Sequence, residues 1–283
     1  MSILIQASEL MSTTDRTVIL DVRWKLGGPP GHDDYLAGHV PGAVYVPLGT
    51  ELAAHGEPRD GRHLLPSVED LQTAARRWGI REGDTVVAYD DNGNLAAARA
   101  WWLLRWAGLE DVRLLDGGLA AWIAAGGALD TDDVVPEPGD VSLGSGSLST
   151  IDIEGASTFP GVLLDARAAD RYRGEVEPID PKAGHIPGAV SAPTAGNLAD
   201  DGRFRSPEEL RHRFEALGVR EGVSVAAYCG SGVTAAHEVA ALAIAGFDAG
   251  LYPGSWSQWS NHEDRPVATG AEPGERPHDR RGR

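Results

Sequence analysis

The strongest constraint on the fold is an internal duplication. Four short motifs in the first half of the chain recur in the same order in the second half, at an offset of about 140 residues. Each copy contains an apolar segment ending in Asp-x-Arg, a Gly-His-[Val/Ile]-Pro-Gly-Ala block, an Arg-Glu-Gly segment with an apolar run after it, and a Gly…Trp pair. A repeat of this length indicates two copies of a whole domain, and 283 residues are enough for two hydrophobic cores.

Within each copy, short apolar runs alternate with helical patterns such as residues 68–78 and 207–217. The second of these begins with Ser206 as a helix N-cap, and Glu209 lies three residues later, as in a capping box. Strands separated by helices are typical of parallel sheets covered on both faces. The sequence therefore predicts an α/β protein of two tandem domains, each a mainly parallel sheet flanked by helices on both faces.

Composition along the chain predicts the domain boundaries. We expect a first domain at residues 1–130 and a second at residues 150–270. Residues 131–149 are rich in Asp, Gly, Ser and Pro and have little periodicity, which predicts a linker. Residues 271–283 consist mostly of Pro, Gly and charged residues, which predicts a disordered tail.

Charge and cysteine content exclude several classes of partner. The net charge of −17 argues against nucleic acid or an anionic membrane, so local positive groups must attract any anionic substrate. One cysteine cannot form an internal disulfide, which favours a reducing compartment. The first residues lack a basic region, and no apolar run approaches the about 18 residues that span a membrane. We therefore expect a cytoplasmic protein without an export signal.

The single cysteine, Cys229, lies between an apolar run at residues 223–227 and an Ala-rich segment at residues 235–245. This pattern predicts a buried strand, a tight loop and a helix. Gly230 and Gly232 allow the backbone to curl until successive N–H groups point inward, and the helix adds the positive end of its dipole. Such a loop stabilises an anion, which favours a nucleophilic thiolate at Cys229. A buried packing residue, the alternative, does not require this loop.

The two copies differ at this position. Asp90 stands where the second copy has Cys229, and residues 91–94 read Asp-Asn-Gly-Asn. Asp90 as a phosphate-accepting nucleophile is an alternative, but a carboxylate in an anion-binding loop is a poor phosphate acceptor without Mg²⁺ ligands around it. We therefore expect the first domain to be non-catalytic.

Together, the duplication, the Asp-x-Arg and Pro-Gly-Ala blocks and the cysteine loop resemble the two-domain rhodanese-type sulfurtransferases. The resemblance extends over residues 7–269. The loop Cys-Gly-Ser-Gly-Val-Thr at residues 229–234 is similar to that of 3-mercaptopyruvate sulfurtransferases, whereas thiosulfate-preferring members usually carry basic residues just after the cysteine. Because thiosulfate is a dianion, it gains from a cation in the loop. The resemblance implies 3-mercaptopyruvate as the donor, with thiosulfate as the alternative.

The resemblance also implies covalent sulfur transfer, in which Cys229 takes sulfur from a small donor and becomes a persulfide. The acceptor is expected to be thioredoxin, a small thiol or cyanide. Four residues around the nucleophile are implied to bind the substrate: Gly230, Gly232, Val233 and Thr234. No cofactor is implied, and nine histidines without a cysteine pair predict no metal site.

Two further residues match the family's machinery for protonating the leaving group. Ser231 corresponds to its loop serine, and His63, in Gly-Arg-His-Leu-Leu-Pro at residues 61–66, corresponds to the histidine presented to that serine. The family usually completes this pair with an aspartate shortly after the first Pro-Gly-Ala block, where this chain has none. Either Glu51 orients His63 or no residue does.

For the substrate carboxylate, Arg171 matches a family arginine. A second arginine is expected about nine residues later, near Ile179 and Asp180, where this chain has none. Lys182 is predicted to supply the charge instead, with less directional binding than an arginine.

Two other functions are considered. A cysteine phosphatase of related fold requires an arginine where this chain has Ala235, and its loop is longer. A non-catalytic persulfide carrier would contain the same cysteine loop, but it would not release pyruvate from mercaptopyruvate. Four residues shared by both copies are expected to be structural: Arg23, Arg167, His39 and His185.

Overall fold

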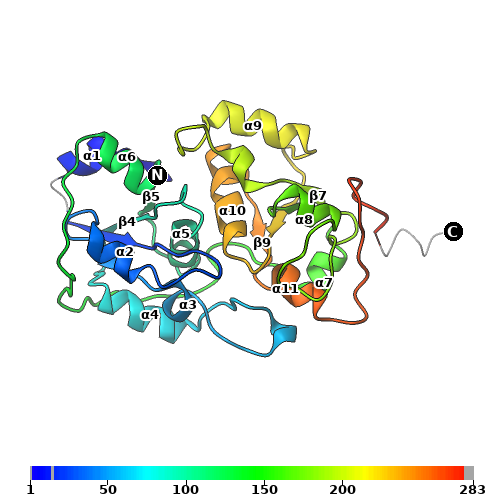
Figure 1. Cartoon of the computed structure of the whole chain (residues 1–283), viewed down its shortest axis with the longest axis horizontal. Helices are drawn as coiled ribbons and strands as arrows, with labels where there is room; N and C mark the ends of the chain where they lie inside the picture. Colours follow the sequence, from blue (N-terminus) through cyan, green and yellow to red (C-terminus); the bar gives the residue numbers. More distant parts are fainter. Residues whose placement is uncertain (1, 14–15, 277–283) are drawn as a thin grey trace. The chain divides into compact units, whose positions relative to one another are not determined.

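The computed structural model describes residues 2–13 and 16–276, and the chain forms two compact units (Figure 1). Unit 1 comprises residues 1–54, 65–148 and 198–204, and unit 2 comprises the remaining residues. Two short segments therefore lie outside the domain that the sequence assigns them to. Residues 55–64 belong to unit 2, and residues 198–204 belong to unit 1.

Unit 1 contains a five-stranded sheet in the order β1-β5-β4-β2-β3, with every pair parallel. Its strands are β1 (Leu4–Ile5), β2 (Thr17–Asp21), β3 (Val44–Tyr45), β4 (Thr85–Tyr89) and β5 (Val112–Leu115). Its helices are α1 (Ala7–Ser12), α2 (His32–Ala37), α3 (Leu48–Glu51), α4 (Val68–Arg77), α5 (Ala97–Trp106) and α6 (Gly118–Ala124).

The core of unit 1 follows from the two-residue period of its strands. Val87 and Tyr89 of β4 point to the face where Leu119 and Trp122 of α6 complete a buried cluster. Helix α5 packs against β4 and β5 and is buried along most of its length. Because both faces are covered, β4 is apolar on both sides, as expected for a parallel strand.

Unit 2 repeats this arrangement with four strands in the order β7-β6-β8-β9, all parallel. A single bridge from Thr150 to Leu251 stands in the place of β1. The strands are β6 (Val162–Asp165), β7 (Val190–Ser191), β8 (Val225–Tyr228) and β9 (Gly250–Leu251). The helices are α7 (Ile153–Ser157), α8 (Ala169–Arg173), α9 (Pro207–Ala216), α10 (Thr234–Ile244) and α11 (Ser255–Ser260), with 3₁₀ turns η1 (Pro58–Asp60) and η2 (Thr194–Asn197).

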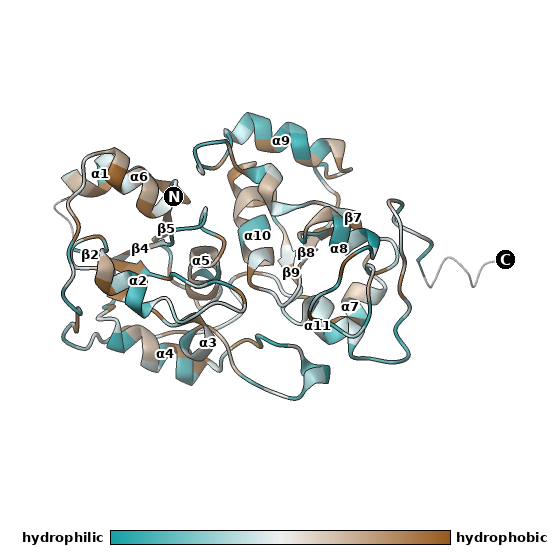
Figure 2. Cartoon of the chain, viewed as in Figure 1, coloured by the Kyte–Doolittle hydropathy of each residue, from teal (hydrophilic) through white to brown (hydrophobic). Residues whose placement is uncertain are grey.

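The core of unit 2 has the same two layers. Ala226 and Tyr228 of β8 join a buried cluster with Trp256 and Trp259 of α11. On the other side of the sheet, α10 packs against β8 and against α9. Helix α9 is largely hydrophilic (Figure 2) and begins with the predicted capping box, in which Ser206 and Glu209 exchange hydrogen bonds of 3.2 and 3.0 Å. The predicted fold class is therefore confirmed.

The segment predicted as a linker packs onto unit 1. Val141 is buried, Gly139 N donates to Arg76 O at 2.7 Å, and Gly144 N donates to Ala107 O at 2.8 Å. These contacts place residues 131–148 with the first unit.

Part of the segment predicted as a disordered tail also makes regular contacts. Gly188 N donates to Pro273 O at 2.6 Å, and the Arg276 guanidinium donates to Phe159 O and Gly161 O, both at 2.7 Å. Residues 271–276 thus continue unit 2, while residues 277–283 lie outside the described residues. In the described part of the chain, no helix is long and apolar enough to cross a membrane.

Candidate active site

The region around Cys229 forms the strand, loop and helix that the sequence predicts. Cys229 follows the last residue of β8, and α10 begins at Thr234. Gly232 has a φ of +79°, and a Cβ atom there would lie 2.5 Å from Pro253 O. Only glycine fits this position, because a side chain would meet both an unfavourable dihedral and a backbone oxygen.

Cys229 is 2% exposed and is held through its own backbone. Its N–H donates to Ser255 Oγ at 3.1 Å, and Ser255 Oγ donates to Tyr252 O at 2.8 Å. Ser255 itself has a φ of +53° and is fully buried. A buried non-glycine residue in this strained conformation is maintained by its surroundings, here by two hydrogen bonds that fix the position of the nucleophile.

Several N–H groups of the loop are available to an anion, which stays the predicted role of this loop. Gly232 N donates to Cys229 Sγ at 3.2 Å. None of the described residues accepts a hydrogen bond from the N–H of Gly230, Ser231 or Val233, and α10 has no side-chain cap. Unpaired N–H groups at the start of a helix attract negative charge. The loop can therefore hold a sulfur anion attached to Cys229.

The structure brings the predicted Ser231 and His63 together. Ser231 Oγ and His63 Nδ1 share a hydrogen bond of 2.8 Å, so a proton can pass between them. Both residues lie in unit 2, because residues 55–64 belong to it. Arg62, next to His63 in the chain, donates its backbone N–H to Ser257 Oγ at 3.1 Å, and this hydrogen bond holds the segment in place.

Glu51 has other partners. One carboxylate oxygen accepts from Trp78 Nε1 at 2.5 Å, and the other forms an ion pair with Arg77. All three residues lie in unit 1. These contacts give no support to the hypothesis that Glu51 orients His63.

Arg171, on α8, lies beside the cysteine loop. A Cβ atom on Gly230 would be 3.4 Å from Arg171 Nη1. Its Nη2 atom pairs with Glu177 at 2.7 Å and lies 3.5 Å from Asp180. The predicted substrate arginine is thus next to the residue that follows the nucleophile.

The sequence did not reveal a second arginine at this place. Arg62 Nη2 donates to Gly230 O at 3.3 Å, and Arg62 Nη1 forms an ion pair with Asp180. Burial raises the pKa of Asp180 above its usual range, and Arg62 opposes that rise. The one available sequence signal was the position of Arg62 directly before His63.

Lys182, predicted to supply the second positive charge of the site, contacts three backbone carbonyls. Its ammonium donates to the backbone carbonyls of His262, Glu263 and Arg265, at 2.6, 3.3 and 3.2 Å. An ammonium has three N–H donors, and all three are used here. Arg62, rather than Lys182, places a second positive charge against the cysteine loop.

The residues repeated in both copies are structural, as expected. Arg167 forms a buried bidentate pair with Asp165, and His185 Nδ1 contacts Tyr172 O at 2.8 Å. Arg23, Asp21 and His39 make the corresponding bonds in unit 1. Within residues 2–13 and 16–276, no group of three His, Cys, Asp or Glu side chains is arranged to hold a metal ion.

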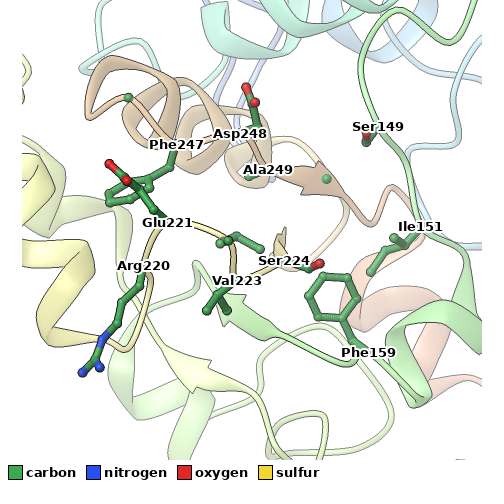
Figure 3. A pocket seen from close by; sticks show the side chains of 14 residues that line it. Ser149, Ile151, Phe159, Arg220, Glu221, Val223, Ser224, Phe247, Asp248 and Ala249 are labelled. Carbon is green, nitrogen blue, oxygen red and sulfur yellow. The ribbon is translucent and has the colours of Figure 1, made fainter.

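A separate hollow of about 560 Å³ lies at the opposite ends of the unit 2 strands from Cys229 (Figure 3). Ser224 precedes β8 and Ala249 precedes β9, so this hollow is at the amino ends of the strands. Cys229 follows the carboxyl end of β8, where ligands of parallel α/β sheets usually bind. The hollow is therefore not part of the cysteine site.

Comparison with known proteins gives a consistent assignment. Residues 6–125 and 152–262 match the model of the Rhodanese-like domain family. A Mycobacterium tuberculosis protein provisionally named thiosulfate sulfurtransferase SseB is 49% identical, over 95% of this chain and 97% of the relative. A Pseudomonas aeruginosa protein provisionally named 3-mercaptopyruvate sulfurtransferase is 48% identical, over 89% of this chain and 92% of the relative.

A solved structure has a similar fold over most of the chain. The crystal structure of SseA from Escherichia coli, described with the rhodanese fold and the mechanism of 3-mercaptopyruvate sulfotransferases, has a TM-score of 0.80 at 30% identity. The match covers 90% of this chain and 99% of that chain. With one matching region in each half and relatives that align along nearly their full length, this chain belongs to the rhodanese-like domain family.

Proposed function

We propose that the protein is a sulfurtransferase that moves a sulfur atom from 3-mercaptopyruvate to a thiol acceptor through a persulfide on Cys229. The observation that carries this proposal is the arrangement of the β8–α10 loop. Its thiol follows a buried strand and accepts from Gly232 N, while the N–H groups of Gly230, Ser231 and Val233 have no acceptor among the described residues. Ser231, two residues after Cys229, shares a hydrogen bond of 2.8 Å with His63.

In the first half-reaction, the Cys229 thiolate attacks the sulfur of mercaptopyruvate. An S–S bond forms, the C–S bond breaks, and its electron pair leaves with pyruvate as the enolate. Ser231 donates a proton to the enolate and takes one from His63, so pyruvate leaves as a neutral ketone with its carboxylate. The loop N–H groups stabilise the persulfide that remains.

In the second half-reaction, an acceptor thiolate attacks the outer sulfur of the persulfide. The acceptor becomes a persulfide, and Cys229 leaves as a thiolate, so no external oxidant or reductant is consumed. Thioredoxin or a small thiol satisfies this chemistry, and cyanide can attack the same outer sulfur and leave with it as thiocyanate, again releasing the Cys229 thiolate. The two half-reactions predict ping-pong kinetics.

The choice of mercaptopyruvate rests on the residues after the nucleophile. Gly230 and Ser231 carry no charge in the loop, while Arg171 lies beside Gly230 and can bind one carboxylate. Thiosulfate is the second candidate donor, favoured by the provisional name of the Mycobacterium tuberculosis relative.

The test is to mix the purified protein with mercaptopyruvate and a thiol and to measure pyruvate, with Cys229→Ser as the blank. We expect pyruvate from the wild type only, and a mass increase of one sulfur atom on Cys229 when the acceptor is omitted. A carrier would give no pyruvate without a donor enzyme. A higher kcat/KM for thiosulfate than for mercaptopyruvate would overturn the donor assignment.

A further inference from the structure

Two guanidinium groups meet at the peptide that follows the nucleophile. Arg62 Nη2 donates to Gly230 O at 3.3 Å, and a Cβ atom on Gly230 would lie 3.3 Å from Arg62 Nη2 and 3.4 Å from Arg171 Nη1. The arginines come from segments more than a hundred residues apart in the chain, yet both belong to unit 2. They converge on Gly230, the residue that follows the proposed nucleophile.

A buried carboxylate bridges the two arginines. One oxygen of Asp180 pairs with Arg62, the other lies 3.5 Å from Arg171 Nη2, and the Asp180 side chain is 2% exposed. Glu177 pairs with Arg171 at 2.7 Å. Glu177 also lies 3.4 Å from Arg167, which pairs with Asp165 at 2.6 Å. Three cations and three anions therefore form this network, and their formal charges cancel.

Both arginines keep hydrogen-bonding capacity for another anion. Their Nε atoms are buried, and no acceptor for either is found among the described residues. Arg62 and Asp180 also line a cavity of about 380 Å³, together with His55 and Asn261, so a small molecule can reach Arg62. A guanidinium with an unused donor can bind a carboxylate or sulfonate through a charge-assisted hydrogen bond.

We propose that Arg62 binds the anionic end of the sulfur donor together with Arg171, and that Asp180 sets donor choice by keeping this pair of arginines near neutrality. This inference rests on the proposed sulfurtransferase function. A dianion gains about twice as much as a monoanion from each added positive charge. The Asp180 carboxylate therefore disfavours thiosulfate more than mercaptopyruvate, and it acts as a repulsive element of specificity.

The experiment compares kcat/KM for mercaptopyruvate and thiosulfate in the wild type, Arg62→Gln, Arg62→Lys and Asp180→Asn. Arg62→Gln should raise KM for mercaptopyruvate at least about tenfold, with kcat changed much less, because binding and not proton transfer is lost. Arg62→Lys should restore part of the affinity through its charge. Asp180→Asn should shift the donor ratio towards thiosulfate by about tenfold or more.

Matched controls come from the exposed ion pair of Arg173 and Glu175, 2.6 Å apart and close in sequence to Arg171. Arg173→Gln and Glu175→Gln change the net charge by the same amounts, and both should leave KM and the donor ratio unchanged because water screens exposed charges. Melting temperatures of all variants show whether each remains folded.

Each outcome decides a different statement. A folded Asp180→Asn protein with the wild-type donor ratio, or a folded Arg62→Gln protein with the wild-type KM, overturns the inference and leaves the proposed function intact. A shift that the Glu175→Gln control reproduces also overturns it, because net charge alone would then explain the effect. A wild-type protein that turns over neither donor refutes the proposed function, and the inference with it.

Discussion

Asp90 and Cys229 each follow the last residue of a central strand, and each lies in a loop that leads into a buried helix. The backbone carbonyls of both residues accept equivalent hydrogen bonds of 3.0 Å. Leu119 N donates to Asp90 O, and Trp256 N donates to Cys229 O. The side chains of Asp90 and Cys229 differ in the number of backbone hydrogen bonds that they accept. Asp90 accepts four backbone hydrogen bonds of 2.8 to 3.0 Å, from Asn92, Asn94, Ala96 and Ala97.

We propose that this difference is the reason why only the loop of unit 2 is catalytic. In unit 1 the loop N–H groups donate to the carboxylate of Asp90. This carboxylate is fully buried and is part of the chain, so no other anion can take its place. In unit 2 a single N–H contacts Sγ, and the neighbouring donors remain available to the sulfur that Cys229 is proposed to receive. We therefore propose that the loop is an anion site in both units, filled by the Asp90 side chain in unit 1 and available to a transferred group in unit 2.

The largest expected effect comes from making the second loop like the first. Cys229→Asp should abolish pyruvate release from mercaptopyruvate, by at least about a thousandfold in kcat/KM, because no thiolate is available to form the persulfide. Its melting temperature should stay at or above that of Cys229→Ser, since a carboxylate can accept the free N–H donors. Turnover within tenfold of the wild type would disprove the assignment of the nucleophile.

The converse change tests the loop of unit 1. In Asp90→Asn, the side-chain NH₂ group must face N–H donors that now contact a carboxylate oxygen. We expect a loss of about 2–4 kcal/mol in the free energy of unfolding, measured by urea denaturation, with kcat of the folded protein retained. Asp91→Asn, in the neighbouring exposed ion pair with Lys25, is the control and should change stability by less than about 1 kcal/mol. Equal stabilities of the two variants would show that the four hydrogen bonds are not needed.

The helices that follow the two loops differ by one buried titratable side chain, which predicts that the stability of the protein depends on pH. Glu238 of α10 is fully buried against Asn197 and Arg213, and burial raises its pKa to about 7. Counted back from the Ala-Gly that follows each helix, α5 has Ala100 at this position. Between pH 4.5 and about 7, Glu238 keeps its proton in the folded protein but loses it in the unfolded chain. The contribution of Glu238 to the free energy of unfolding is therefore complete below pH 4.5 and is lost as pH rises through about 7.

The unfolding free energy should therefore fall by up to about 3 kcal/mol between pH 4.5 and 7. Urea denaturation of the wild type and of Glu238→Gln at several pH values measures this. The variant should lack this contribution, because glutamine does not titrate. Identical pH profiles of the two proteins would contradict the assigned shift.

The smallest expected effect concerns the residue that holds the cysteine backbone. Unit 1 has Gly118, with a φ of +58°, where unit 2 has Ser255. Ser255→Gly relieves the strained backbone but removes the acceptor of Cys229 N–H, so we expect kcat to fall about threefold to tenfold, with stability within about 1 kcal/mol of the wild type. Ser260→Ala is the control, since its Oγ has no partner in the described part of the chain. Wild-type kcat in Ser255→Gly would show that this bond does not position the nucleophile.

Much of the fold could be predicted because its signals are local or repeated. The duplication indicated two parallel sheets, Ser206 and Glu209 indicated the start of α9, and the glycines beside Cys229 indicated the loop. The pairing of Ser231 with His63 was implied by the family resemblance, since nothing near either residue in the sequence indicates a contact across such a separation.

The ion pairs of the site could not be predicted from the sequence. Whether an arginine or lysine is available depends on the carboxylates and carbonyls that the tertiary structure places around it, as Arg62, Asp180 and Lys182 demonstrate. The assignment of residues 55–64 was missed for the same reason, because their position in sequence lies well inside the first domain.

That assignment has a consequence for how the two halves depend on each other. If the protein were cut near residue 149, the carboxyl-terminal fragment would retain Cys229, Ser231 and Arg171 but would lack His63 and Arg62, which travel with the amino-terminal fragment. Because both residues have proposed roles in the site, we expect the first half to be needed for activity although it has no cysteine.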